Sequence, residues 1–463
     1  MNQSKRYTLL LINPAIKSGR GFIVNKDTRY QPLALGIIAA LTPSHWKVKI
    51  LDENFRDFHY YEADLVGFTA FSSTVTRAYE LSSLYRIKGI PTIIGGIHAS
   101  MCPEEAGQYC DSVVTGEAES VWPTVIDDFE NHRLKKVYTG ILTDMIHSRK
   151  PLRELFHPGY IFGSIQTTRG CPMNCDFCSV TAFNGAQYRY RPIPEVIEEW
   201  REIQQRNVFI LDDNIVGNTK NAQERAIELF KAIIASGVKK DWIGQASLNV
   251  ADNEKVLKYA GMSGCRMLFI GIESEREDQL EQANKRLNMK MGVGSYNSVF
   301  RKMHRYGIAV IAGFIFGWEN DTKERIDHRT MFTRRCHADS IQSTLLTPLP
   351  GTRLHERLKQ EGKLALDQYP QDWQYYGYEH LTFHPDHMLR EEMQKYILKA
   401  IDKVYDPAFL KRRMLKTWFR TRSLTTAYWS YMSNWNYRSM AFGNEQKPRN
   451  WLIDRPGKGG GIS

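Results

Sequence analysis

The sequence lacks any long apolar run. Hydrophobic residues make up 42% of its 463 residues, yet no stretch reaches the roughly 18 apolar residues that a membrane-spanning helix needs. The first six residues also lack the features of a secretory signal peptide, because no long apolar segment precedes a small-residue cleavage site. We therefore expect a cytoplasmic protein with packed domains, and the length is sufficient for two or three of them.

Cysteine is also scarce. The chain has seven cysteines, and an odd number in a long chain favours a reducing compartment over a disulfide framework. Three of them share one short stretch with the spacing C-x3-C-x2-C, at Cys171, Cys175 and Cys178. The other four are single and scattered, at Cys102, Cys110, Cys265 and Cys336.

The C-x3-C-x2-C stretch carries the clearest chemical signal. Three thiolates on one tight loop can hold three corners of an iron–sulfur cluster, because thiolate is the ligand that such clusters prefer. A structural zinc site would need a further Cys/Cys or Cys/His pair to complete its tetrahedron, and the scattered cysteines do not form one. An iron without a fourth protein ligand has an open position for a substrate. The spacing therefore favours a cluster over zinc or three unreactive thiols.

The same stretch resembles a family signature. The cysteine spacing, with the aromatic Phe177 before the last cysteine, resembles the radical S-adenosylmethionine (SAM) superfamily. Thr168-Arg169-Gly170 before the motif and Pro172 within it resemble the branch that has a cobalamin-binding domain in front. That branch includes the anaerobic Mg-protoporphyrin ester cyclases and the hopanoid methylases. The resemblance implies three cofactors, a [4Fe-4S] cluster, SAM and cobalamin, and an electron donor such as flavodoxin or ferredoxin.

Five short apolar segments precede the cysteine motif, and helical patterns lie between several of them. Strands that alternate with helices predict a doubly wound parallel sheet, with ligands at the carboxyl ends of its strands. The resemblance implies that residues 1–140 form a flavodoxin-like (Rossmann-like) cobalamin-binding domain. The predicted strands are residues 7–12, 47–52, 65–69, 91–96 and 112–117.

Small and polar residues stand at the carboxyl ends of these strands. Glycine lets a backbone approach a bulky ligand, so we expect this group to contact cobalamin. A lone loop histidine is more often a hydrogen-bonded structural group than a ligand, and a glutamate here can instead cap the following helix. The predicted cofactor-binding residues are Ser72, Ser73, Gly95, Gly96, His98, Gly116 and Glu117.

The usual cobalt-ligating motif is missing. Many cobalamin proteins carry D-x-H-x-x-G after the first strand, where the histidine binds cobalt from below, but residues 13–18 read NPAIKS. The nearest match, Asp57-Phe58-His59, follows the second strand and lacks the glycine. We therefore expect cobalamin to be bound without a lower histidine ligand. The alternative is a domain that binds no corrin.

Six further strands are expected, and the first of them leads directly into the cysteine loop. They are too few for a complete eight-stranded barrel, and they fit the partial six-stranded β/α barrel that the resemblance implies for residues 155–355. Active residues of such barrels lie at the C-terminal ends of the strands. The predicted strands are residues 164–168, 208–212, 242–248, 267–271, 310–317 and 340–345.

The strand-end rule and the resemblance together select residues for SAM. Asp213 and Asn214 lie where the family contacts the methionine part of SAM, although such a cluster could also be a helix N-cap. Gln245 and Glu273 are candidates for the ribose hydroxyl groups. Phe177 and the segment from Gly313 to Gly317 could form the adenine slot. Two arginines after the cysteine loop, Arg189 and Arg191, could hold the SAM carboxylate or face solvent.

The remaining region, residues 356–463, is predicted to be mainly helical and carries most of the positive charge. Residues 401–463 contain twelve Lys/Arg and four Asp/Glu, in a chain of net charge +11. Leu410, Met414 and Trp418 predict a basic amphipathic helix. Basic and aromatic residues over 409–435 suit peripheral contact with the inner face of a membrane, or single-stranded nucleic acid, which we do not expect. The other alternative is a helix that packs on the barrel and covers the substrate pocket.

The sequence thus predicts a cobalamin-dependent radical SAM C-methyltransferase. As the resemblance implies, a deoxyadenosyl radical from SAM takes hydrogen from an unactivated carbon. Methylcobalamin then delivers a methyl group to that carbon, and a second SAM methylates the cobalamin again. The family branch and the basic aromatic tail favour a hopanoid-like membrane lipid as substrate. One alternative is a cyclase or rearranging oxidoreductase of the same branch. Another is a corrin- or cluster-based sensor, which would not need the residues predicted to bind SAM.

Overall fold

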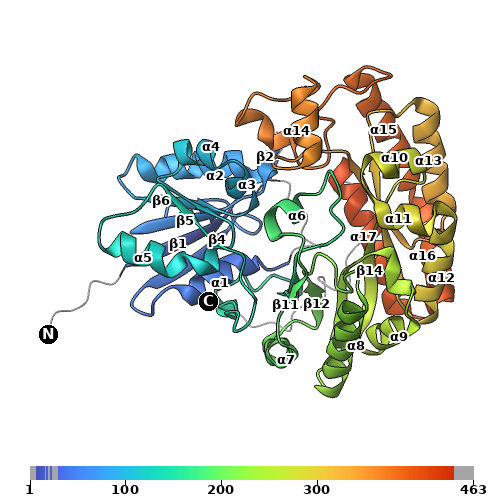
Figure 1. Cartoon of the computed structure of the whole chain (residues 1–463), viewed down its shortest axis with the longest axis horizontal. Coiled ribbons are helices and arrows are strands. Elements are labelled where there is room, and N and C mark those ends of the chain that lie inside the picture. The colour runs from blue at the N-terminus through green and yellow to red at the C-terminus, as the bar shows by residue number, and fades with distance from the viewer. Residues whose placement is uncertain (1–6, 16, 19–20, 23–29, 443–463) are drawn as a thin grey trace, which may run out of the picture.

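The computed structural model describes residues 7–15, 17–18, 21–22 and 30–442. In Figure 1 an N-terminal α/β domain and a larger β/α unit lie side by side, and the C-terminal helices pack against the larger unit. The predicted fold class is confirmed. None of the helices in these residues is both long and apolar enough to cross a membrane.

The N-terminal domain is built on a parallel six-stranded sheet of order β4-β1-β5-β6-β7-β8. The first five strands in chain order give the flavodoxin-like arrangement 2-1-3-4-5, and β8 extends the sheet by one strand that the sequence did not suggest. The strands are β1 (Thr8–Asn13), β4 (Lys47–Asp52), β5 (Leu65–Thr69), β6 (Thr92–Gly95), β7 (Ser112–Thr115) and β8 (Val137–Thr139).

Helices cover both faces of this sheet, which explains why its strands are continuous apolar runs. In β1, Leu9 and Leu11 pack under α1 (Leu33–Leu41) and α5 (Trp122–Glu130). The alternate residues Leu10 and Ile12 pack under α2 (Ser72–Arg86) on the opposite face. Two short helices, α3 (Ile97–Met101) and α4 (Pro103–Tyr109), follow β6. The carboxyl ends of the strands are therefore left open for a ligand.

The second unit is a parallel sheet of order β16-β15-β14-β13-β12-β9, so each strand pairs with the one before it in this unit. Six strands in sequence order form an open, partial barrel, as predicted. The strands are β9 (Phe162–Ile165), β12 (Asn207–Ile210), β13 (Asp241–Ala246), β14 (Cys265–Glu273), β15 (Ala309–Phe316) and β16 (Ser340–Leu345). The intervening helices include α7 (Ile193–Glu202), α8 (Lys220–Ala235), α9 (Glu254–Met262), α12 (Tyr296–Arg305) and α13 (Lys323–Arg335).

The last helix, α17 (Leu424–Phe442), bridges the two edge strands of the open barrel. On β16, the backbone N–H of Ile341 donates to Asn434 (3.1 Å) and the Tyr437 hydroxyl donates to Gln342 (3.0 Å). Towards β9, the ring of Trp429 packs edge-on against Phe162, with centroids 5.5 Å apart. The helix therefore contacts both edge strands of the open barrel.

Helix α16 (Pro407–Thr421) precedes it and follows α15 (Arg390–Val404). The predicted stripe of Leu410, Met414 and Trp418 does not face the barrel as a unit. Leu410 is buried, but Trp418 is exposed, and the buried face continues instead through Arg413 and Thr417. The three stripe residues are divided between the two sides of the helix because polar partners on the barrel accept hydrogen bonds from the buried face, which an apolar pattern cannot indicate.

A segment of the C-terminal region reaches back to the N-terminal domain. Within η5 (Gln371–Tyr375), Trp373 is buried in the core that contains α2. Its indole N–H donates to Glu105 (2.9 Å), and its ring packs edge-on to His98 with centroids 5.1 Å apart. Because the C-terminal region contacts both domains, it helps to fix their relative position.

Candidate active site between the two domains

A cavity of about 680 Å³ lies between the carboxyl edge of the N-terminal sheet and the cysteine loop. Its volume falls within the range of small-molecule sites. Four of the predicted cobalamin-binding residues line it: Gly95, Gly96, Gly116 and Glu117. The second unit and α17 complete the wall with Gln166, Arg169, Phe183, Asn184, Leu211 and Met440.

The inner part of this cavity is apolar and depends on small residues. A Cβ atom at Gly67 would lie 2.9 Å from Leu11 Cδ2, and one at Gly96 would lie 2.8 Å from Thr69 Oγ1. Gly96 also has a left-handed φ of 93°, which glycine adopts most readily. Glycine at these positions lets the chain pack closely at the carboxyl edge of the sheet. The cavity beside them has a largely apolar lining, which fits a large, partly apolar cofactor such as cobalamin.

Three other predicted residues, Ser72, Ser73 and His98, do not line the cavity. His98 is buried, with Nδ1 3.0 Å from Ser72 Oγ and Nε2 3.3 Å from Glu105 Oε1. Burial alone would raise the pKa of Glu105, but hydrogen bonds from His98, Trp373 and Tyr79 outweigh it and lower that pKa. This network fits the structural alternative for His98.

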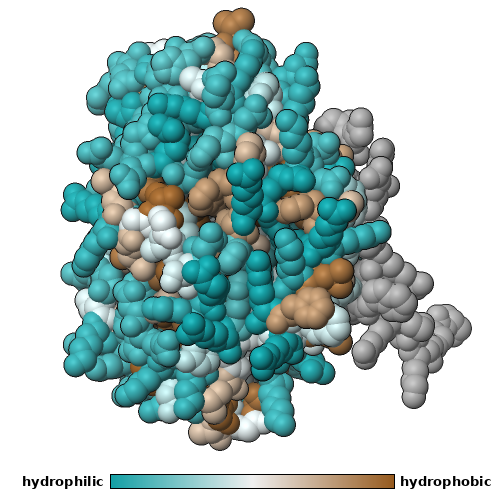
Figure 2. Space-filling view, turned by 90° about the vertical axis from the view of Figure 1, so that its right-hand side faces the viewer, coloured by the Kyte–Doolittle hydropathy of each residue, from teal (hydrophilic) through white to brown (hydrophobic). Residues whose placement is uncertain are grey.

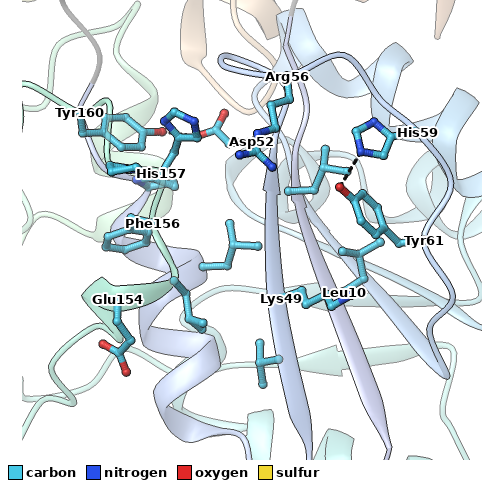
Figure 3. Close-up of a pocket in the computed structure, with 16 residues that line it drawn as sticks. Leu10, Lys49, Asp52, Arg56, His59, Tyr61, Glu154, Phe156, His157 and Tyr160 are labelled. Carbon is cyan, nitrogen blue, oxygen red and sulfur yellow. Dashed lines mark hydrogen bonds between the residues drawn. The ribbon is translucent and has the colours of Figure 1, made fainter. Parts of the chain in front are cut away.

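A smaller cavity of about 370 Å³ adjoins the large one along the edge strand β4. Figure 3 shows Asp52, His157 and Tyr160 on one side of it and His59 with Tyr61 on the other. His59, the nearest sequence match to a cobalt ligand, lies here, with Nε2 2.6 Å from the Tyr61 hydroxyl. The lining of the larger cavity includes no histidine among the described residues. Cobalamin without a lower histidine ligand therefore stays a prediction.

The cysteine loop is held from several sides. Before it, β10 (Thr168–Arg169) pairs with β11 (Arg189–Tyr190), and after it α6 (Ser179–Asn184) begins directly behind Cys178. The Arg353 guanidinium donates to the Asp176 carboxylate (2.6 Å), and the Asp176 backbone N–H donates to Ala283 (3.1 Å). These bonds fix the loop between α14 (Arg353–Gln360) and the segment after β14.

The buried surroundings of the three cysteines favour the neutral thiols, so the thiolates need a positively charged partner nearby. Burial raises the pKa of Cys178 to about 12 and also raises the pKa values of Cys171 and Cys175. No set of three or more Cys, His, Asp or Glu side chains in the described ranges is arranged to hold a single metal ion. Ligands of one zinc ion must share one tetrahedron, whereas cysteines on a cluster bind separate corners. Three thiols on one loop therefore fit the donor set of an iron–sulfur cluster.

Lys285 is a residue of this site that sequence reasoning missed. Its ammonium nitrogen lies 2.7 Å from Glu273 Oε1 and 5.9 Å from the centroid of the Phe177 ring. Burial opposes its charge, but the Glu273 carboxylate and the Cys175 thiolate outweigh burial and raise the pKa of Lys285. The structure thus brings the predicted residues Phe177 and Glu273 together beside the cysteines, with a cation between them.

The other predicted SAM residues lie at the ends of β12 and β13 and on β15. Asp213 accepts hydrogen bonds from the Gly170 backbone N–H (3.2 Å) and from Asn184 (3.0 Å), so it contacts the cysteine loop. Burial raises the pKa of Asp213.

Asn214 donates to Ser247 (3.0 Å). Gln245 lies partly buried on β13, and Gly313 lies against the Phe269 ring, which a Cβ atom would approach to 2.6 Å. Their contacts with SAM stay predictions.

Glu117 connects the two domains. Its carboxylate accepts from the Arg189 guanidinium (2.7 Å) and from the backbone N–H of Thr143 (2.7 Å), and Arg169 lies 3.3 Å away. Arg169 also donates to Glu119 (2.5 Å). Arg191 pairs with Glu199 (2.6 Å). Neither Arg189 nor Arg191 is therefore a free surface residue, and Glu117 joins the cavity wall to the cysteine loop.

Comparisons with known proteins agree with this geometry. Residues 165–331 match the Radical SAM superfamily, and residues 19–126 match the B12 binding domain. The chain is a radical SAM protein with a B12-binding domain in front, which confirms the resemblance that the cysteine stretch suggested. Its cofactors are a [4Fe-4S] cluster, SAM and cobalamin.

Relatives and solved structures match over most of the chain. Bacteriochlorophyllide d C-8(2)-methyltransferase of Chlorobaculum tepidum is 29% identical over 87% of this chain and 91% of its own length. Hopanoid C-2 methylase of Rhodopseudomonas palustris is 28% identical over 73% of this chain and 66% of its own length. The fold is similar to that of TsrM, a radical S-adenosylmethionine methyltransferase from Kitasatospora setae with cobalamin and a [4Fe-4S] cluster bound. That match has a TM-score of 0.68 and 16% identity, and it covers 87% of this chain and 90% of TsrM.

Proposed function

We propose that this chain is a cobalamin-dependent radical SAM C-methyltransferase that acts on an unactivated carbon. The observation that carries the proposal is that one residue both lines the cobalamin cavity and stands next to the cysteine motif. Arg169 lines the cavity assigned to cobalamin and stands two positions before Cys171. The methyl-donating and radical-forming cofactors would therefore face one another across a short stretch of one loop. Similarity to named methyltransferases over nearly the whole chain supports the same function.

The bound cofactors supply the radical and methyl-transfer chemistry, and the protein positions them. Cys171, Cys175 and Cys178 would hold the cluster and leave one iron open for SAM. The open cradle at Gly95 and Gly96 would receive the corrin. The ion pairs of Glu117 and Glu119 with the cysteine loop would fix the distance between the two sites. Helix α17 packs on β14, β15 and β16 and would shield that part of the barrel from water.

For the substrate, we propose a hopanoid-like polycyclic membrane lipid. The wall of the cavity assigned to cobalamin includes large apolar side chains from both domains and from α17. Those that the corrin leaves uncovered would suit a flat hydrophobic molecule bound beside the cofactor. Those side chains are Tyr30, Ile37, Phe71, Phe183, Leu211 and Met440. The relatives named hopanoid C-2 methylase and hopanoid C-3 methylase support this class.

A bacteriochlorophyllide-like macrocycle is a second candidate substrate. It is also flat, polycyclic and largely apolar, so the same wall would suit it. The observation in its favour is coverage, because the two bacteriochlorophyllide methyltransferases match 87% and 89% of this chain, whereas hopanoid C-2 methylase matches 73%. Turnover also needs an electron donor, for which flavodoxin or ferredoxin is proposed.

The test is anaerobic reconstitution with iron, sulfide and hydroxocobalamin, followed by turnover with SAM, a reductant and either a hopanoid or a bacteriochlorophyllide. We expect deoxyadenosine, S-adenosylhomocysteine and a product heavier by one CH₂ with one of the two substrates. Cys175→Ala should abolish the deoxyadenosine and the methylated product. Cys102→Ala, a partly buried cysteine outside the motif, is the matched control and should retain both. Deoxyadenosine without S-adenosylhomocysteine would instead favour the cyclase or rearrangement, and loss of cobalamin would contradict the assigned cavity.

A further inference from the structure

Helix α16 and the start of α17 expose a row of large apolar side chains. Leu415, Trp418, Phe419 and Leu424 have exposed fractions of 48%, 39%, 74% and 66%. The rings of Trp418 and Phe419 stack on one another, with centroids 5.3 Å apart. Single exposed apolar residues are ordinary on a protein surface, but four within ten positions form a patch that needs an explanation.

The buried face of α16 has the opposite character. The Arg413 guanidinium donates to the carbonyl of Thr333 (2.6 Å), and the Thr417 hydroxyl donates to Asp339 Oδ1 (2.7 Å). A helix that only packs on a core normally turns its apolar face inward and its polar face to water. Here polar groups face inward and several of the larger apolar groups face outward, so packing on the barrel does not account for the outer face.

Positive charge surrounds the apolar row. Lys411, Arg412, Lys416 and Arg422 are exposed, and none of the four forms an ion pair or a side-chain hydrogen bond with a residue in the described ranges. Residues 407–442 contain seven Lys/Arg and no Asp/Glu. On α16, Lys411, Leu415 and Trp418 are spaced by four and three positions and therefore share one face, and Arg422 follows directly as the C-cap of the helix. We call the four apolar and four basic residues the α16 surface.

The composition of the α16 surface selects one kind of partner. Two copies of the surface would bring like charges together, which opposes self-association. A nucleic acid would stack its bases on the aromatic rings, but the aliphatic side chains Leu415 and Leu424 can neither stack with a base nor pair with a phosphate. At a lipid surface, aromatic and leucine side chains enter the interface while Lys and Arg contact anionic head groups. On the side of the molecule that α12, α13 and α16 share, Figure 2 shows apolar groups among mainly hydrophilic residues.

We propose that the α16 surface docks the protein on an anionic lipid bilayer. The contact is peripheral, because the apolar row is only about three helical turns long and none of the described helices could span a membrane. This inference goes beyond the proposed methylation and does not depend on it, since the surface lies on the outside of α16 and not in the cofactor cavity. A membrane-borne substrate would make the two compatible.

The test is sedimentation of the reconstituted full-length protein with vesicles. Vesicles of phosphatidylcholine mixed with phosphatidylglycerol should retain the protein, and vesicles of phosphatidylcholine alone should retain far less. Raising the salt concentration should weaken the binding, because screening reduces the attraction to head groups. The double variant Phe419→Ser/Leu424→Ser should lower the apparent affinity at least about tenfold, because two large apolar side chains are lost from the contact. The triple variant Lys411→Gln/Arg412→Gln/Lys416→Gln should remove the preference for anionic vesicles.

The matched control is Ile87→Ser. Ile87 is 84% exposed, but it lies at the end of α2 on the other domain, so its substitution should leave vesicle binding unchanged. Each variant should keep its cobalamin and cluster absorbance, which separates loss of binding from misfolding. Equal binding of wild type and double variant would overturn the proposal. The proposal would also be overturned if the wild-type protein formed a dimer and the double variant did not. Binding of the wild type to single-stranded DNA but not to vesicles would overturn it as well. Because no turnover is measured, failure of the methylation assay would not affect this result.

Discussion

The Lys285 ammonium nitrogen lies 2.7 Å from Glu273 Oε1, next to the loop that carries the three cysteines. The pKa of Lys285 is raised by the carboxylate and by the thiolates of Cys175 and Cys178 against the opposing effect of burial, so the residue stays protonated. A buried cation at this position favours negative charge on the thiolates and on whatever they bind. Lys285 is therefore expected to influence the cluster and not only to neutralise Glu273.

Replacement of Lys285 by methionine should make the reduction potential of the cluster more negative. The reduced cluster carries one more negative charge, and the variant lacks the cation that stabilises it. We expect a shift of about 60 mV, which corresponds to roughly a tenfold change for a one-electron couple. An anaerobic redox titration followed by electron paramagnetic resonance measures it. Lys290→Met, on an exposed lysine of the following helix, is the control, and equal potentials in the two variants would show that Lys285 has no electrostatic role.

Replacement of Gly95 by valine should prevent cobalamin binding without unfolding the protein. A Cβ atom there would lie 3.5 Å from the Val114 carbonyl oxygen, an ordinary contact, while the added methyl groups would occupy the cavity that Gly95 lines. We expect cobalamin retention to fall at least about tenfold by visible absorbance, at a nearly unchanged melting temperature. Gly294→Val, at a position with no atom within 4 Å, should retain cobalamin fully. Full retention by Gly95→Val would place the corrin elsewhere.

The domain contact at Glu117 should make stability depend on pH. Burial alone would raise the pKa of Glu117, but the Arg189 hydrogen bond and the Arg169 charge outweigh burial and lower it below 4.5. A carboxyl group with a lowered folded-state pKa contributes stability that is complete above its unfolded-state pKa and is lost as the pH falls through the folded-state value. Glu117→Gln should therefore cost about 2 kcal/mol of unfolding free energy at pH 7, and less in acid.

Urea unfolding of wild type and Glu117→Gln at neutral pH and near pH 4 would measure this difference. The exposed residue Glu62 provides the control Glu62→Gln, which should change the unfolding free energy by less than about 0.5 kcal/mol at either pH. A cost for Glu117→Gln that stays constant or grows in acid would contradict the assignment of the lowered pKa to its two arginines.

Much of the fold was predictable because buried parallel strands appear in the sequence as short, nearly continuous runs of apolar residues. The runs that became β1, β5 and β15 are mostly apolar, since helices cover both faces of the N-terminal sheet and the barrel strands are buried on both sides. The strand β8 has only three residues, Val137–Thr139, two of them exposed, and so it forms no such run. The cysteine loop was found because its chemistry requires three thiols within eight positions.

The side chains around the site were predicted less completely, because their contacts come from distant parts of the chain. Lys285 reaches Glu273 only because the chain after β14 folds back, and the sequence spacing of twelve residues does not indicate this. His98 was expected near the cofactor, but Glu105 and Trp373 enclose it, and Trp373 comes from a segment more than 270 positions away. Glu117 was expected at a ligand or a helix cap, whereas its two arginine partners belong to the other domain.

Asp339 shows how α16 is held, and it supports a last prediction. Its buried carboxylate accepts hydrogen bonds from the Val310 backbone N–H (2.8 Å) and the Thr417 hydroxyl (2.7 Å), and His304 Nε2 lies 2.7 Å away. Burial opposes the charged carboxylate, but His304 and these hydrogen bonds outweigh burial and lower the pKa of Asp339. Asp339 therefore joins β15 and α12 to α16.

Thr417→Val keeps the size of the side chain but removes its hydrogen bond to a buried carboxylate. We expect a loss of about 1–3 kcal/mol of unfolding free energy by urea denaturation, with faster hydrogen exchange confined to α16 and α17. Thr425→Val, at an exposed position of α17, should cost less than about 0.5 kcal/mol. If both variants lose the same stability, the bond to Asp339 does not hold the helix. If exchange accelerates in α16 and α17 alone, these helices form a unit that can open without the barrel, so α17 could then uncover the side of the active site by local unfolding.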